Sequence, residues 1–191
     1  MFAFKYKYYL YLENTKDFNL NLIKKRDKFI VIYRNNNNNE KLFDLKKFRR
    51  KCREKGVLFF IANNFSLSNS LQSDGIYISA KNSSFKQLYQ KRNKFKIIGS
   101  AHNYKEISQK LNQGCEEIIL SRLFKTDYAN KTSFYGITKF NIITNKFKND
   151  FIALGGIKIT NLNALRMLNV QSFSLLSEVK KKPANIINRL F

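Results

Sequence analysis

Cationic, amide and hydroxyl side chains, together with one glycine pair, recur directly after short apolar runs of this 191-residue chain. In chain order the candidate site residues are Arg34, Asn63, Asn64, Asn82, Ser100, Arg122, Lys125, Thr126, Gly155, Gly156, Leu176 and Ser177. Arginine and lysine neutralise oxyanions, and glycine lets consecutive backbone N–H groups approach an anion closely. These types indicate a site for an anionic ligand, although the glycine pair could also merely shape a tight turn.

Metal and nucleophile chemistry finds little support in the residue types. His102 is the sole histidine, so neither a histidine metal cluster nor a Ser-His-Asp triad can be assembled. We expect His102 to cap a helix or to play another structural role. Cys52 and Cys115 lack metal-binding spacing and are interpreted as reduced, partly buried residues. We therefore assign no residue as a metal ligand.

The elements that would position these residues alternate between two patterns. Short β-rich runs predict strands at 8–12, 29–33, 57–62, 75–78, 96–99, 117–120, 151–154 and 173–176. Amphipathic stretches predict helices at 41–55, 65–71, 84–92, 103–112 and 161–168, a short helix or turn at 17–25, and a last helix running toward Leu190. The segment 135–146 could form either element.

Alternation of this kind predicts a parallel sheet, and eight strands are enough to close it. We therefore predict an α/β fold consisting of one (β/α)8 TIM barrel domain over residues 1–191. An open doubly wound sheet is the structural alternative, but it needs no eighth strand. Barrel enzymes place their sites on the loops that follow the strands, where the candidate residues lie.

Six short motifs occur in this order: IANN at 61–64, DGIYI at 74–78, IIGSAH at 97–102, FKTD at 124–127, ALGGI at 153–157 and LLS at 175–177. In order and spacing they resemble thiamine phosphate synthases and the related TenI proteins, over roughly residues 29–179. The resemblance implies a transferase that joins hydroxymethylpyrimidine, released from its diphosphate, to a thiazole phosphate in thiamine biosynthesis.

The resemblance also implies roles for individual residues. It places a thiazole phosphate at the backbone of Gly155, Gly156, Leu176 and Ser177. It gives the diphosphate to Arg34. The family's lysine after the sixth strand falls near Ala129, and we expect the nearby Lys125 to take its place. We take Arg34, Lys125 and Ser100 as the catalytic residues. Asn63 and Ser100 would orient the pyrimidine or its leaving group, with Arg122 and Thr126 nearby in substrate binding.

Two departures from the family pattern concern Mg²⁺, the cofactor that the resemblance implies. The family's two metal-binding aspartates fall at Asn64 and Asn82, and asparagine brings no negative charge. Arg122 also stands where TenI-type tautomerases have a histidine. A diverged barrel that binds a thiazole or thiamine phosphate without this catalysis is therefore a second hypothesis.

Composition leaves a third hypothesis open, because the formal net charge is +23 and the pI is about 10.1. Such a charge is typical of basic nucleic-acid-binding proteins, but the lysines are scattered and fit a drift in composition better. We expect small phosphorylated metabolites as partners and no specific nucleic acid. The absence of a long apolar segment predicts no membrane span and a cytoplasmic location. Assembly into a homo-oligomer is left open.

Overall fold

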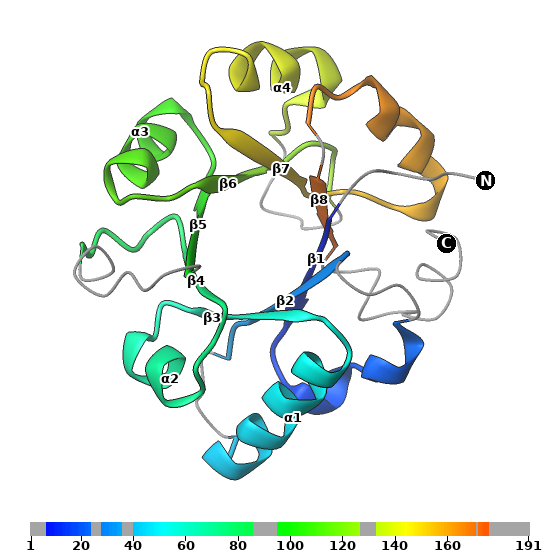
Figure 1. Ribbon diagram of the computed structural model, residues 1–191. Helices are drawn as coiled ribbons and strands as arrows, with labels where there is room; N and C mark the ends of the chain where they lie inside the picture. Colours follow the sequence, from blue (N-terminus) through cyan, green and yellow to red (C-terminus); the bar gives the residue numbers. More distant parts are fainter. Residues whose placement is uncertain are drawn as a thin grey trace.

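Eight parallel strands form a closed ring in the computed structural model, with each strand paired to its neighbours in sequence order and β8 paired to β1 (Figure 1). The structure describes residues 7–23, 28–35, 40–85, 95–126, 133–170 and 172–175. The strands are β1 (Tyr8–Leu12), β2 (Phe29–Tyr33), β3 (Leu58–Ala62), β4 (Gly75–Ile78), β5 (Lys96–Ala101), β6 (Glu117–Ser121), β7 (Asp150–Leu154) and β8 (Ser172–Leu175). The predicted barrel is confirmed, and the open sheet is excluded.

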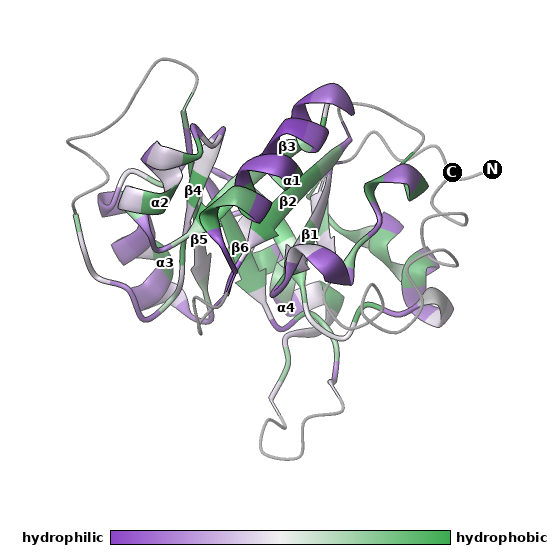
Figure 2. Cartoon of the chain, turned by 90° about the horizontal axis from the view of Figure 1, so that it is seen from below, coloured by the Kyte–Doolittle hydropathy of each residue, from purple (hydrophilic) through white to green (hydrophobic). Residues whose placement is uncertain are grey.

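Alternate residues of each strand face two different cores, as the pleat of a strand requires. In β2, Ile30 and Ile32 belong to a cluster inside the barrel, whereas Phe29, Val31 and Tyr33 pack outward beneath the helices. The remaining members of the inner cluster are Tyr9, Tyr11, Phe60, Tyr77, Ile98, Ile119 and Ile152. Figure 2 shows the result as hydrophobic strands surrounded by helices such as α1 whose outer surface is hydrophilic.

The helices that cover the ring are α1 (Leu42–Glu54), α2 (Phe65–Ser70), α3 (Tyr104–Asn112) and α4 (Gly136–Thr144). Within the described residues, 3-10 helices add to them at Thr15–Asp17, Leu20–Leu22 and Ile159–Met167. The ambiguous segment at 135–146 is thus helical, and the helix expected at 161–168 is of the 3-10 type. Ser84 and Phe85 are not helical. Most of the helix expected at 84–92, and the last helix, lie outside the described residues.

A partly buried ion pair connects α1 to the barrel. The Arg49 guanidinium is 2.6 Å from the Asp74 carboxylate, and the second Asp74 oxygen accepts a hydrogen bond from the Phe59 amide. Cys52, on the same face of α1, and Cys115 are both free and buried, as expected. Within the described ranges we find no helix long and apolar enough to span a membrane.

Candidate active site

The carboxyl ends of parallel strands meet at one end of a barrel, so the loops after the strands share a single rim. Nine of the predicted residues lie on that rim: Arg34, Asn63, Asn64, Asn82, Arg122, Lys125, Thr126, Gly155 and Gly156. Ser100 lies just below it, within β5, which is two residues longer than predicted. Leu176 and Ser177 lie outside the described residues.

An amide network joins the loops after β3 and β4. The Asn63 side chain donates to the Ser79 hydroxyl at 3.1 Å and accepts from the Ser79 amide at 2.9 Å. Its carbonyl oxygen also accepts from the Asn82 side chain at 3.0 Å. Asn63 has a φ of 58°, a left-handed conformation that asparagine tolerates better than most residues. These three side chains therefore hold one another at fixed positions on the rim.

Asn64 and Asn82, where the resemblance places metal ligands, already use their carbonyl oxygens. Asn64 caps α2 by accepting from the Leu67 amide at 3.0 Å, and Asn82 accepts from the Ser84 amide at 2.8 Å. Both side chains are neutral, whereas Mg²⁺ sites in proteins rely on carboxylates and phosphates. The donor set at these two positions does not fit a bound Mg²⁺.

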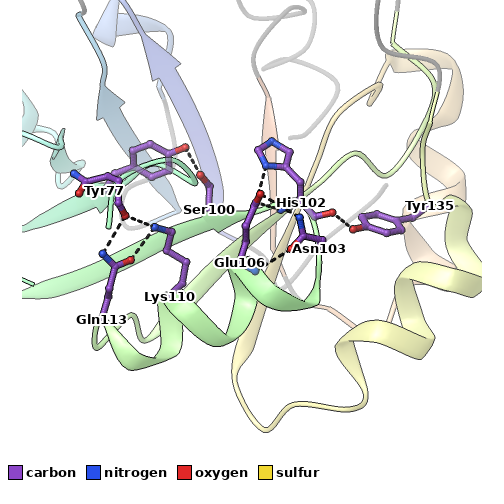
Figure 3. Close-up of polar contacts among 9 residues, drawn as sticks. Tyr77, Ser100, His102, Asn103, Glu106, Lys110, Gln113 and Tyr135 are labelled. Atoms are coloured by element: carbon purple, nitrogen blue, oxygen red, sulfur yellow. Dashed lines mark hydrogen bonds and ion pairs between the residues drawn. The ribbon is translucent and has the colours of Figure 1, made fainter. Parts of the chain in front are cut away.

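Under the rim, inside the barrel, the side chains of Tyr11, Tyr77 and Ser100 form a floor. Tyr77 donates a 2.8 Å hydrogen bond to Ser100, which is 6% exposed (Figure 3). The Tyr11 ring meets the Tyr77 ring edge to face, with centroids 5.4 Å apart. Burial raises the pKa of the Tyr11 phenol well above its usual value of 10, and Tyr77 adds to that shift. The Tyr11 phenol in this floor is therefore neutral at any ordinary pH.

The loops after β6 and β7 pack tightly against each other. Backbone hydrogen bonds run from Leu123 to Leu154 at 2.9 Å and from Phe124 to Gly155 at 3.0 Å. A Cβ at Gly155 would lie 3.0 Å from the Arg122 stem. A Cβ at Gly156 would lie 2.4 Å from the Lys125 carbonyl oxygen. Both glycines have positive φ, so close approach and backbone conformation each require them.

Arg34 and Lys125, the two cations predicted to hold a diphosphate, lie on opposite sides of the ring. Arg34 follows β2 and Lys125 follows β6, with three strands between them in either direction. Both side chains are exposed. A ligand that contacts both cations would therefore have to lie across the mouth of the barrel.

His102 lies at the start of α3, where Figure 3 shows its ring beside Glu106. The Glu106 carboxylate accepts from the His102 amide at 2.7 Å and lies 2.9 Å from the ring Nδ1. Asn103 is the N-cap, and Tyr135 donates to the His102 carbonyl oxygen. The arrangement stabilises the helix start, in line with the structural role expected for His102.

Sequence reasoning missed several residues that contact the rim network. Ser79 falls in the loop after the fourth predicted strand, but it was given no role, because a serine after a strand carries little signal by itself. Lys110 on α3 and Gln113, the residue that caps its end, both donate to the Asn82 backbone carbonyl oxygen. The type of an amphipathic-helix residue does not reveal such a contact, because lysine there is usually solvated.

A cavity of about 440 Å³ opens at the other end of the barrel, away from the rim. Its lining includes Lys7, Glu117, Asp150 and Ser172, which precede or begin strands. Barrel enzymes act at the carboxyl end, and conservation at the opposite end is associated with stability. We therefore place the candidate active site at the rim and not in this cavity.

The chain is similar in sequence to known proteins over most of its length. The family model described as thiamine monophosphate synthase matches residues 13–179. A thiamine-phosphate synthase of Prochlorococcus marinus (strain AS9601) is 26% identical over 134 residues, covering 70% of this chain and 38% of that protein. A thiamine-phosphate synthase of Clostridium perfringens is 22% identical over 170 residues, covering 84% and 82%.

The chain spans between 38% and 42% of the length of three Prochlorococcus marinus relatives. Among solved structures, thiamine phosphate pyrophosphorylase from Pyrococcus furiosus superposes with a TM-score of 0.70, at 15% identity and 98% coverage of both chains. At that identity the likeness shows the shared barrel fold and nothing finer.

Proposed function

The chain belongs to the thiamine monophosphate synthase family, and from this premise we propose that it joins hydroxymethylpyrimidine, taken from its diphosphate, to a thiazole phosphate. One observation carries the proposal: the predicted site residues that the structure describes lie at or just below one end of a closed barrel. The names of the relatives support the same reaction.

In the proposed reaction the bond between the pyrimidine methylene carbon and the diphosphate oxygen breaks first. The diphosphate leaves with the bonding electron pair, and the thiazole ring nitrogen then donates its lone pair to the resulting cation. No protein nucleophile is required, so the protein contributes through positioning and electrostatic stabilisation. Arg34 and Lys125 would stabilise the leaving charge from the two sides of the mouth.

The floor and the amide network suit the neutral part of the substrate. Ser100, oriented by Tyr77, offers its hydroxyl to a heteroaromatic ring, and the side-chain nitrogens of Asn63 and Asn82 offer N–H donors. The backbone of Gly155 and Gly156, after β7, would hold the thiazole phosphate, with Arg122 and Thr126 beside it. The proposed reaction uses no Mg²⁺, since Asn64 and Asn82 do not fit it.

A turnover assay with both precursors, run across a Mg²⁺ titration, tests the proposal. We expect product formation with little dependence on Mg²⁺ and a fall of about 100-fold in kcat for Lys125→Ala, as for loss of one charge-stabilising donor. Lys105→Ala, an exposed lysine on α3, is the matched control. Turnover that strictly requires Mg²⁺ would contradict the metal-free part, and an unimpaired Lys125→Ala would remove Lys125 from the site.

A second candidate function is favoured by the same asparagines. With both amide oxygens already engaged, the barrel would bind a thiazole or thiamine phosphate without turning it over. Calorimetric binding of either phosphate, combined with no product under any condition, would select this candidate. The proposed synthase reaction would then be abandoned.

A further inference from the structure

Lys110 is a lysine with no exposed surface, on a helix whose other lysine is exposed. Its relative exposure is 0%, and the stem crosses the outer face of β5. The stem fits there because residue 99 is glycine: a Cβ at Gly99 would lie 2.9 Å from the Lys110 Cβ and Cγ. Long charged side chains are almost never fully buried unless their charge finds partners.

The partners of the Lys110 nitrogen are oxygen atoms of the loop after β4 and of α3. It donates to the Asn82 backbone carbonyl at 2.6 Å and to the Gln113 side-chain oxygen at 2.7 Å. Gln113, also fully buried, donates to the same Asn82 carbonyl at 3.0 Å and to the Ser84 carbonyl at 2.7 Å. Figure 3 shows the Lys110 and Gln113 side chains next to each other at the end of α3.

These contacts continue into the rim without a break. The Asn82 backbone carbonyl accepts from Lys110 and Gln113, and the Asn82 side chain donates to Asn63. The Asn63 side chain in turn is hydrogen-bonded to Ser79. A cation surrounded by neutral oxygens thus lies behind the two loops from which the resemblance draws its metal ligands. Burial lowers the pKa of Lys110, an effect that Cys115 and Glu106 oppose.

We propose that Lys110 is a positioning residue: a built-in cation that fixes the Asn82 loop and, through Asn63, the loop after β3. In this chain the ammonium group and Gln113 order that part of the rim, and a divalent ion is not needed to do so. Lys110 does not reach the substrate. Its effect on turnover rests on the proposed function, but its effect on the loops does not.

The experiment compares Lys110→Met, which keeps the stem and removes the ammonium, with Lys105→Met on the exposed side of the same helix. Side-chain amide NMR signals of Asn63 and Asn82 report the loops directly, with and without Mg²⁺. We expect both signals to shift in Lys110→Met only, and Mg²⁺ to leave the wild-type signals unchanged. Unchanged signals in folded Lys110→Met, or a wild-type shift on adding Mg²⁺, would overturn the proposal.

Kinetics provide the second measurement. Misplaced binding groups cost up to about 100-fold in rate, so kcat/KM for the pyrimidine diphosphate should fall by about 10- to 100-fold in Lys110→Met. KM for the thiazole phosphate should stay unchanged, because its proposed site lies beside β7. A general loss of structure would instead raise the KM values for both substrates, and that result would count against a positioning role. A wild type without turnover would end the proposed function, while the NMR comparison still decides the role of Lys110.

Gln113→Met is a second variant that tests the same network if Lys110→Met fails to fold. It removes two of the hydrogen bonds to the loop and leaves the ammonium in place. We expect the same Asn63 and Asn82 signals to shift, by a smaller amount. A folded Gln113→Met protein with wild-type signals would contradict the proposed network.

Discussion

At the scale of the residue, the rim is organised by hydrogen bonds to groups that sequence reasoning would have left free for ligands. Glu106, on α3 close to the rim, is one of the groups held by such hydrogen bonds. Burial alone would raise the pKa of this carboxyl, but hydrogen bonds from the side chain and backbone of His102, and from Asn103, outweigh burial and hold the pKa below its usual 4.5. The carboxylate is therefore bound more firmly in the folded chain than its acid form would be.

The sign of the resulting pH effect follows from linkage. A carboxyl with a lowered pKa contributes stability that is fully present above pH 4.5 and is lost as pH falls through the folded-state pKa. We expect Glu106→Gln to lower the free energy of unfolding at pH 7. The difference in this free energy between the variant and the wild type should become smaller below pH 4.5. Urea unfolding at a series of pH values measures this, with exposed Glu54→Gln as control. A gap that stays constant with pH would contradict the assignment.

At the scale of the element, the loops after β6 and β7 behave as one packed unit because two glycines let their backbones touch. This packing changes what a mutation at Gly156 can test. Any side chain there meets the Lys125 carbonyl before it could meet a ligand. Gly156→Asp would consequently report on the fold as well as on phosphate binding.

Two alanine substitutions separate conformation from contact. Gly136 and Gly156 have nearly the same φ, +67° and +66°, but a Cβ at Gly136 would meet nothing within 4 Å. Gly136→Ala should cost about 1–2 kcal/mol for the left-handed backbone alone. Gly156→Ala should cost a further 1–3 kcal/mol, roughly, from overpacking. Equal losses on thermal or denaturant unfolding would show that the two loops do not hold each other as described.

At the scale of the whole molecule, the two ends of the barrel serve different purposes. At the end opposite the rim, Glu117 accepts a hydrogen bond from Tyr9 and pairs with Lys96 at 3.2 Å. Burial tends to lower the pKa of Lys96, but Glu117 outweighs burial and raises this pKa. The pKa of Lys7 is lowered by burial and by the neighbouring charge of Lys96. One carboxylate thus keeps two lysines and a phenol together at the base of the barrel.

Removing that charge should destabilise the fold and leave the rim intact. We expect Glu117→Gln to lower the free energy of unfolding by about 1–3 kcal/mol, the usual cost of leaving buried polar groups unsatisfied. Its neighbour Glu116→Gln makes the same chemical change at an exposed position and should cost far less. Ligand binding at the rim should be equal in both variants. A Glu117→Gln protein as stable as Glu116→Gln would refute this role.

Much of the fold could be predicted from local pattern. The β-branched and aromatic run at 29–33 gave a strand with the predicted bounds, since such residues fit a pleated, buried surface. The segment 159–167 is a 3-10 helix closed by a hydrogen bond from Leu168 to Leu165, a distinction that apolar spacing over nine residues does not make. Strand order and closure followed from the number of strands.

The candidate site was less accessible to sequence reasoning, because its contacts depend on packing between elements. Residue type and position after a strand were enough to select Asn63 and Asn82. Lys110 could not be selected, because its burial depends on Gly99, eleven positions earlier and on the strand beneath it. Arg34 and Lys125 could be chosen individually, but their separation across the mouth becomes visible only once the ring is closed.

A cation that belongs to the chain differs from an ion taken from solution in how its occupancy is set. A dissolved metal fills its site according to its free concentration, and a chelator can withdraw it. The Lys110 nitrogen is tethered within the folded chain, so its effective concentration at the Asn82 carbonyl is fixed by folding itself. If Lys110 orders the Asn82 loop as proposed, order in this part of the rim should not change with the metal content of the solution around the protein.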